Sequence, residues 1–521
     1  MNKRLLLVLA VALAGCDDDF LTAVPPDQVS DANFWRTEQD AILATTAVYP
    51  FLYGHEVLFL DAASDNAWQS QAFGGWYPTG NGALNADNGT TAAFWRDSYT
   101  AIRRANEVLA NIGRIEFTTP GLEDRLKGEA RLLRAYHYIM LVNLFGDVPL
   151  ITRPLTVAEG QVSRTPRAEV IDTVFADLDY AASVLPTSYG AADRGRATKG
   201  AAIALKARAA LYEARWQAAA DAAQAVTALN VYSLHPDFRA LFTYTGERSP
   251  EIILDEEYLQ SQRSHNVFGD LAPRSAQGLS RVVPLRALVD EFYMSDGLPL
   301  TQSPLYKSHP DSQYLNRDAR LYGTLLYPGA PCSFCVPAGV YDSRPSSLTA
   351  DRVLRDIDAT ATGYQQLKYV DPADAAARTN SGLNMIVLRY ADVLLMYAEA
   401  KTELGQLDAS VTDAINQVRR RAGMPDVPAG LSQDSLRSVV RHERRVELAL
   451  EGLRLFDIRR WRIADQVMPG TTHGIDYIDA TTGLQQTIVG ELRGFASRNY
   501  LWPVPARELG LNPNLTQNPG Y

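Results

Sequence analysis

Cysteine and histidine are scarce in this chain of 521 residues, which has three cysteines and seven histidines. The histidines are scattered, and His442-Glu443 has Val446 where a zinc protease helix would place its second histidine. Phosphate-binding loops, dinucleotide fingerprints and nucleophile elbows are also missing. These absences give no catalytic residue, metal or cofactor to propose. A glycosidase carboxylate pair stays open, because such pairs are recognised by their distance in space.

Basic residues are fewer than acidic residues in this chain. Lys and Arg number 50 against 60 Asp and Glu, which gives a net charge of -10. Nucleic acid is therefore not an expected partner, because phosphate binding needs a basic surface. With 46% hydrophobic and 21% charged residues the composition is that of a globular protein, and the length predicts more than one core region.

Long hydrophobic runs are absent except for Leu5–Leu13, which is too short for a bilayer span of about 20 residues. Lys3 and Arg4 precede the run, and Leu13-Ala14-Gly15-Cys16 follows, which resembles a lipobox. We interpret residues 1–15 as a signal peptide and Cys16 as the site of lipidation. A plain signal peptide that carries a cysteine is the alternative. The next residues, 17–19, are all aspartate and resemble the surface-export signal of Bacteroidota-type lipoproteins, although a solvated tether would have the same composition.

Helical periodicity dominates the rest of the chain, so we expect a mainly α fold of TPR-like antiparallel helix pairs with a loop-rich irregular region and a few short strands. An N-terminal helical region is expected over 16–235 and a second region over 236–521, loop-rich in 236–384 and helical in 385–465. Thr119 is expected to cap a helix that runs to Phe145. The predicted helices are Phe94–Asn111, Leu122–Phe145, one opened by Thr198, Trp216–Ala228, Leu388–Leu404, one from Asp408 to Ala422, and Ser432–Leu450.

The two remaining cysteines, Cys332 and Cys335, stand in a Pro- and Gly-rich loop. A redox-active pair would open a helix after a strand, and zinc would need two more ligands nearby. In an exported protein a small disulfide that closes the loop is the expected outcome.

Ordered segments along nearly the whole mature chain resemble the SusD/RagB family. Each is modest alone, but their order is specific. They are Phe34-Trp35, Gly128-Glu129-Ala130-Arg131 to Tyr136, Leu144-Phe145-Gly146-Asp147-Val148-Pro149, Met294-Ser295-Asp296-Gly297, Asn316-Arg317-Asp318, Leu388-Arg389-Tyr390-Ala391-Asp392, His442-Glu443-Arg444-Arg445, Leu501-Trp502-Pro503-Val504-Pro505 and Gln517-Asn518-Pro519-Gly520-Tyr521.

The resemblance implies an outer-membrane lipoprotein that is not an enzyme. Family members sit over a SusC-like TonB-dependent barrel transporter, bind oligosaccharides or in some branches peptides, and deliver them to the barrel. A lipid-anchored glycoside hydrolase and a TPR-type protein-interaction scaffold are the competing functions.

Two regions could supply ligand contacts. The loop 61–91 contains Trp68, Trp76 and Tyr77 beside Asp65 and Asn66, and aromatic rings with amides and a carboxylate suit sugar faces and hydroxyls. A loop held in place by its own aromatic residues is an equally good interpretation.

In the middle region Tyr341 is the favoured contact, because a disulfide before it would stiffen the loop. Ordinary packing is the alternative for Tyr341. Glu443 lies on an apolar helical stripe among many arginines, so we expect a buried structural ion pair there and not a catalytic group.

Overall fold

The computed structural model describes residues 34–72, 74–337 and 339–521. The expected signal peptide, Cys16 and the acidic run lie outside these residues. The described chain is mainly helical, with five two-stranded antiparallel sheets. The prediction of a mainly α fold is therefore confirmed.

Ten helices of seven residues or more carry the described part of the architecture. They are α4 (Glu38–Thr46), α7 (Gly89–Asn111), α8 (Leu122–Phe145), α9 (Arg167–Val184), α10 (Lys199–Tyr212), α11 (Trp216–Ala228), α15 (Tyr390–Glu403), α16 (Ala409–Arg421), α17 (Gln433–Glu447) and α18 (Arg454–Arg460). Shorter ones are α5 (His55–Leu58), α6 (Tyr77–Asn81), α12 (Val267–Leu271), α13 (Arg286–Val289), α14 (Arg320–Thr324), α19 (Ala464–Val467) and α20 (Ala506–Leu511).

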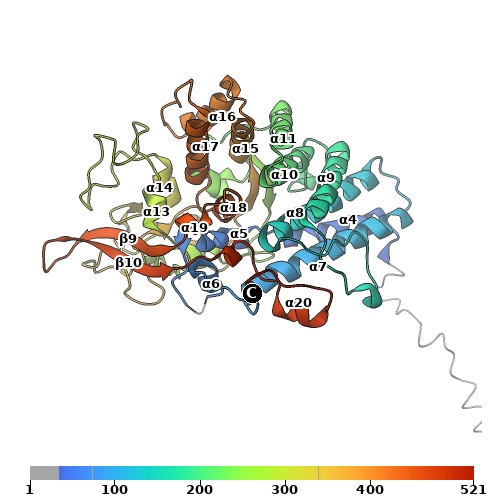
Figure 1. Ribbon diagram of the computed structural model, residues 1–521, viewed down its shortest axis with the longest axis horizontal. Helices are drawn as coiled ribbons and strands as arrows, with labels where there is room; N and C mark the ends of the chain where they lie inside the picture. Colours follow the sequence, from blue (N-terminus) through green and yellow to red (C-terminus); the bar gives the residue numbers. More distant parts are fainter. Residues whose placement is uncertain (1–33, 73, 338) are drawn as a thin grey trace, which may run out of the picture.

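Consecutive helices pack as pairs in a TPR-like array. α7 packs on α8, α8 on α9 and α10 on α11. α11 then packs on α15, and α15 packs on both α16 and α17. Figure 1 shows the result: α4 and α7–α11 occupy one side, α15–α17 continue the array, and the loop-rich segments with β9 and β10 form the opposite end.

The strands are short, apart from one hairpin. They pair as β1 (Ala67–Trp68) with β3 (Val283–Pro284), β2 (Ile252–Glu256) with β8 (Met385–Arg389), β4 (Leu325–Leu326) with β7 (Gln365–Gln366), β5 (Pro331–Cys332) with β6 (Gly339–Val340), and β9 (Gly470–Ile478) with β10 (Gln485–Arg493). In β2–β8, Ile252 faces Arg389, and in β1–β3, Trp68 faces Val283. The β1–β3 pair joins the N-terminal region to the C-terminal region, so the two halves share one body.

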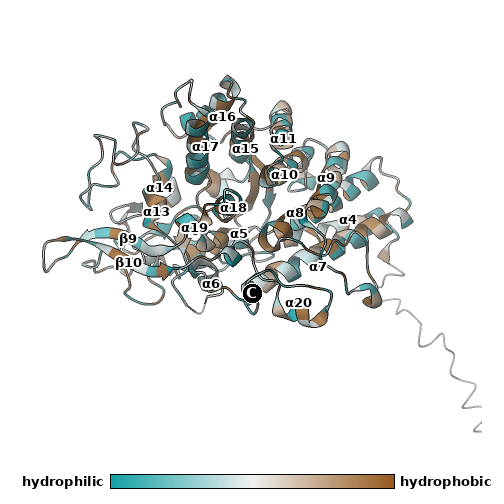
Figure 2. Cartoon of the chain, in the orientation of Figure 1, coloured by the Kyte–Doolittle hydropathy of each residue, from teal (hydrophilic) through white to brown (hydrophobic). Residues whose placement is uncertain are grey.

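The hydrophobic core runs through both halves. α8 is buried along most of its length, and Figure 2 shows hydrophobic colour on it against the hydrophilic colour of α17. The ring of Trp502, which is fully buried, meets Phe94 at 5.5 Å and Phe145 at 5.7 Å between centroids. The C-terminal segment therefore closes the core of the N-terminal helices.

Helix ends explain one wrong prediction. Thr119 does not cap α8, since Gly121 precedes the helix with a φ of 73° and no side chain caps its first amides. The Thr119 hydroxyl donates instead to Glu38, at 2.7 Å. Thr198 and Asp408 do cap α10 and α16, by accepting from the amides of Ala201 and Ser410.

Candidate functional site

The first part of the predicted ligand loop, residues 61–69, is buried against the C-terminal half. Asp65 accepts two hydrogen bonds from Arg454, each 2.8 Å long, and lies 2.9 Å from Arg445. Asn66 donates to Asp61 at 3.0 Å and accepts from Arg445 at 3.1 Å. The polar side chains of this loop are thus engaged by arginines that follow almost 400 residues later.

Burial alone would raise the pKa of the Asp65 carboxyl group. The guanidinium groups of Arg445 and Arg454 outweigh that effect and lower the pKa to about 2. Asp65 is therefore ionised at neutral pH and fixes the loop by charge as well as by hydrogen bonds.

The aromatic residues of the loop lie in different surroundings. Trp68 is 9% exposed and packs against Val283, Leu285 and Ala361, and its indole nitrogen has no hydrogen-bond partner among the described residues. Trp76 belongs to the main core, and Tyr77 is half-buried at the start of α6. Ligand contact by these residues stays a prediction, with Trp68 and Trp76 enclosed by protein in this structure.

Tyr341 is fully buried in a small cluster with the disulfide-bonded Cys332 and Cys335. Its hydroxyl donates to the carbonyl oxygen of Gly363 at 3.2 Å. The disulfide closes the loop as a separate packing unit, and the Tyr341 ring fills its interior. Contact between Tyr341 and a ligand also stays a prediction.

A groove of about 430 Å³ opens beside Asp65. Its volume falls in the range of small-molecule sites. α13 supplies one wall, the β9–β10 hairpin supplies another, and the segment after α19 closes the end. The lining side chains that the chemistry below uses are Asp65, Arg286, Ala287, His473, Thr487 and Arg493.

The groove has a mixed polar and apolar lining, and its polar side chains contact one another and the buried loop. Arg493 donates to the carbonyl oxygens of Ser64 and Ala67, at 2.8 and 3.0 Å, and so ties the hairpin to the buried loop. Arg286 pairs with Asp290 and Asp476. Exposed Ala287 and His473 leave the walls open to solvent. Fixed hydroxyl, imidazole and guanidinium groups can hydrogen-bond the hydroxyls of a bound sugar.

The hairpin that builds this groove was missed from the sequence. Its register runs from Gly470 opposite Arg493 to Ile478 opposite Gln485, with irregular pairing between. β-branched residues are frequent in 470–478 and 485–493, and Gly483 lies in the connecting turn with a φ of 69°. This combination is a usable hairpin signal.

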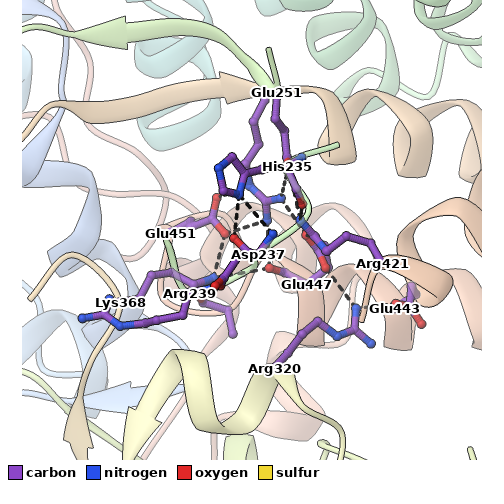
Figure 3. A network of polar contacts seen from close by, with 12 residues as sticks. His235, Asp237, Arg239, Glu251, Arg320, Lys368, Arg421, Glu443, Glu447 and Glu451 are labelled. Carbon is purple, nitrogen blue, oxygen red and sulfur yellow. Dashed lines mark hydrogen bonds and ion pairs between the residues drawn. The ribbon is translucent and has the colours of Figure 1, made fainter. Parts of the chain in front are cut away.

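A second polar cluster lies deep in the molecule and consists of ion pairs (Figure 3). Glu443, fully buried, pairs with Arg320 and with Arg419, the latter at 3.0 Å. Glu447 pairs with Arg320 at 3.0 Å and with Arg389 at 2.6 Å. These contacts join α14, β8, α16 and α17.

Burial would raise the pKa of Glu447, but Arg421, Arg389 and Arg320 together outweigh it and hold the pKa well below its ordinary value. Lys368 completes the cluster by donating to Glu451 at 2.8 Å. Each of these carboxylates faces an arginine or lysine inside the protein. The cluster is therefore suited to joining helices, because its groups are already paired.

Residues 34–72, 74–337 and 339–521 contain no group of three or more His, Cys, Asp or Glu side chains arranged to hold a metal ion. In the same residues, none of the helices combines the length and the apolar character needed to cross a bilayer.

Comparison with known proteins gives a consistent result along the chain. A family model described as "SusD family" matches residues 250–521, and one described as "Starch-binding associating with outer membrane" matches residues 35–211. SusD-like protein P2 of Formosa agariphila is 28% identical, and the alignment covers 100% of this chain and 99% of that relative.

Solved structures of SusD-like proteins have the same fold as this chain. A SusD-like carbohydrate binding protein of Bacteroides fragilis superposes with a TM-score of 0.85 at 29% identity, covering 93% of this chain and 100% of the other. Another SusD-like protein of the same species gives 0.83 at 28% identity, covering 96% and 100%. The resemblance found in the sequence segments is confirmed: because the SusD model alone spans more than half of the residues, this chain belongs to the SusD/RagB family.

Proposed function

We propose that this protein is a non-enzymatic cell-surface lipoprotein that captures oligosaccharides and delivers them to a SusC-like TonB-dependent transporter in the outer membrane. One observation carries the proposal: the whole described fold superposes on a protein described as carbohydrate binding. The outer-membrane association in the description of the second family model supports the location. Peptides, which some branches of the family bind, are the alternative ligand class.

The groove beside Asp65 is the proposed place of capture. Its walls present hydroxyl, imidazole and guanidinium groups that face a space of about 430 Å³. The contacts of Asp65, Arg286 and Arg493 keep these walls in position without the ligand, which lowers the cost of ordering them on binding. Of the predicted contacts, Asp65 lines this groove, whereas ligand contact by Asn66, Trp68, Trp76 and Tyr77 stays a prediction.

A groove-filling substitution tests the site. Ala287 is exposed in the wall, so Ala287→Trp should fold normally and occupy the space, while Ala287→Ser leaves it open. Isothermal titration of both variants and the parent protein against neutral oligosaccharides and peptides is the measurement. We expect binding to be lost only in Ala287→Trp. If Ala287→Trp still binds the ligand, the binding site lies outside this groove.

The same titrations test whether the protein hydrolyses the oligosaccharides that it binds. Each oligosaccharide is recovered after incubation and its chain length is measured by mass spectrometry. We expect every sugar to return intact. Shortened products that disappear on exchange of one carboxylate for an amide would establish a glycoside hydrolase instead.

Anchoring and partnership need their own experiment, because Cys16 lies outside the described residues. Labelled palmitate should enter the mature protein and should be absent from Cys16→Ala. The anchored protein should also co-purify with the barrel transporter when both are produced in one cell. A mature protein without lipid would contradict the proposed anchor.

A further inference from the structure

A second cavity, larger than the groove, lies between the C-terminal end of α8, the segment 459–462 and the C-terminal tail. Its volume is about 910 Å³. Six arginines line it, at positions 164, 167, 459, 460, 462 and 498, against two acidic residues, Asp147 and Glu213. We call this cavity the arginine cleft. Such an excess of positive charge is unexpected in a protein whose net charge is -10.

Two of the six charges are compensated locally. Arg167 pairs with Glu213, and Arg460 pairs with Glu399 and Asp457. The other four, Arg164, Arg459, Arg462 and Arg498, have no carboxylate within ion-pair distance in the described part of the chain. Arg164 has a structural task, since its donors hold the carbonyl oxygens of Phe145, Asp147 and Thr516 and the side chain of Asn518.

Arg459 is the most deeply placed of the uncompensated group. One guanidinium nitrogen donates to the carbonyl oxygen of Asn499 at 3.0 Å, while Nε and Nη1 are buried without a hydrogen-bond partner. Burial lowers the pKa of Arg459 to about 10, and the group stays charged at neutral pH. An enclosed cation without a counterion is costly, and an anion that enters the cleft would offset that cost.

Arg462 and Arg498 form the outer wall. Arg462 lies over the ring of Tyr500 at 4.7 Å, and Arg498 over the ring of Tyr521 at 5.2 Å. Stacking on a ring fixes the plane of a guanidinium group and leaves its N–H edge available for an oxyanion. Arg498 Nη1 donates to the carbonyl oxygen of Gly520 at 3.1 Å, whereas no hydrogen bond from the Arg462 side chain to another described residue is present.

We propose that the arginine cleft binds an anionic saccharide, with carboxylate or sulfate groups on the guanidinium groups of Arg462 and Arg498 and with the enclosed charge of Arg459 adding to their attraction. A guanidinium fork can donate to both oxygens of a carboxylate or to two of the three terminal oxygens of a sulfate group. The concave shape and a volume of about 910 Å³ fit a short oligosaccharide better than a flat protein surface. The choice of a saccharide rests on the proposed function, whereas the choice of an anion rests on the charges described above.

The test compares charged and neutral sugars of one length. Trigalacturonate and a sulfated trisaccharide are the charged probes, and galactotriose is the neutral one. We expect the charged probes to bind and their affinity to fall when sodium chloride is raised from 50 to 300 mM. Arg462→Gln should weaken trigalacturonate binding at least tenfold, and the combined change with Arg498→Gln should abolish it. Arg462 is exposed, so its single variant keeps the test valid if the double variant is unstable.

Arg355→Gln is the matched control, because Arg355 is an exposed arginine with no described side-chain partner, far from the cleft in sequence. It should leave the affinity for trigalacturonate unchanged. Absence of trigalacturonate and sulfated-sugar binding, or equal binding by Arg462→Gln and the parent, overturns the proposal. Binding of an oligoaspartate peptide without either charged sugar overturns it too, in favour of an acidic protein segment.

Failure of this inference is distinguishable from failure of the proposed function. Neutral oligosaccharide binding that is lost in Ala287→Trp, with no charged sugar bound, would refute the arginine cleft alone. Trigalacturonate binding that is lost in Arg462→Gln and unaffected by Ala287→Trp would establish the cleft whatever the groove binds.

Discussion

Replacing Asp65 by asparagine removes the negative charge between Arg445 and Arg454 and keeps the size of the side chain. Arg454 then has no carboxylate partner among the described residues, and Arg445 keeps only its pair with Glu291 at 2.7 Å. Loss of one partner from a buried ion pair costs about 3–5 kcal/mol. We expect Asp65→Asn to lose about this much free energy of unfolding at pH 7, measured by urea denaturation followed by circular dichroism.

The pH dependence gives an independent estimate. The folded protein holds the pKa of Asp65 at about 2, below the ordinary value of 3.8. That difference corresponds to about 2.5 kcal/mol of stability. Because the folded pKa is the lower one, this stability is complete above about pH 5 and is lost as the pH falls toward 2. The difference in free energy of unfolding between Asp65→Asn and the parent protein should therefore decrease by about 1 kcal/mol from pH 7 to pH 3.

Asp87→Asn is the control, since Asp87 is an exposed aspartate in the same loop region. It should change the free energy of unfolding by less than about 0.5 kcal/mol at either pH. The assigned ion pairs would be refuted if Asp65→Asn lost less than about 1 kcal/mol of free energy of unfolding relative to the parent protein at pH 7. A loss that stayed constant down to pH 3 would refute them too.

Three further substitutions test the scaffold by urea denaturation at pH 7. Trp76→Ala should cost about 3–5 kcal/mol, because it empties part of the aromatic core; a cost near zero would place this ring at a solvent-facing site. Glu447→Gln should cost about 3–5 kcal/mol, because it removes the buried negative charge that Arg320, Arg389 and Arg421 share, whereas exposed Asp434→Asn should have little effect. Changing both Cys332 and Cys335 to serine should cost only about 2 kcal/mol, because the closed loop is short; an unfolded double variant would contradict this.

Helix positions were predictable because their signals are local. Apolar spacing predicted Leu122–Phe145 and Trp216–Ala228 with the bounds that the structure has. The helix expected from Leu388 begins only at Tyr390, because residues 385–389 pair with β2 as a strand. Residues 385–389 form a strand because they pair with β2, which lies more than 100 residues earlier in the chain. Apolar periodicity reports only local structure and cannot indicate such a partner.

The site was less predictable for the same reason. The residue types around Asp65 suit a sugar, but whether they face solvent depends on Arg445 and Arg454. Apolar spacing was enough to indicate the buried position of Glu443, because the stripe and the arginines lie in the same stretch of sequence. The arginine cleft had no sequence signal, since its six arginines come from three separate segments.

The contact between Asp65 and Arg454 spans 389 residues, and it sets the order in which the chain can acquire its shape. Until the last fifth of the polypeptide has been synthesised, the charged group near its beginning has no partner. Contacts of such separation close slowly, because a long segment must be ordered first. The early loop consequently lacks these contacts while the rest of the chain emerges, which suits a protein that is exported before it folds, as the proposed signal peptide requires.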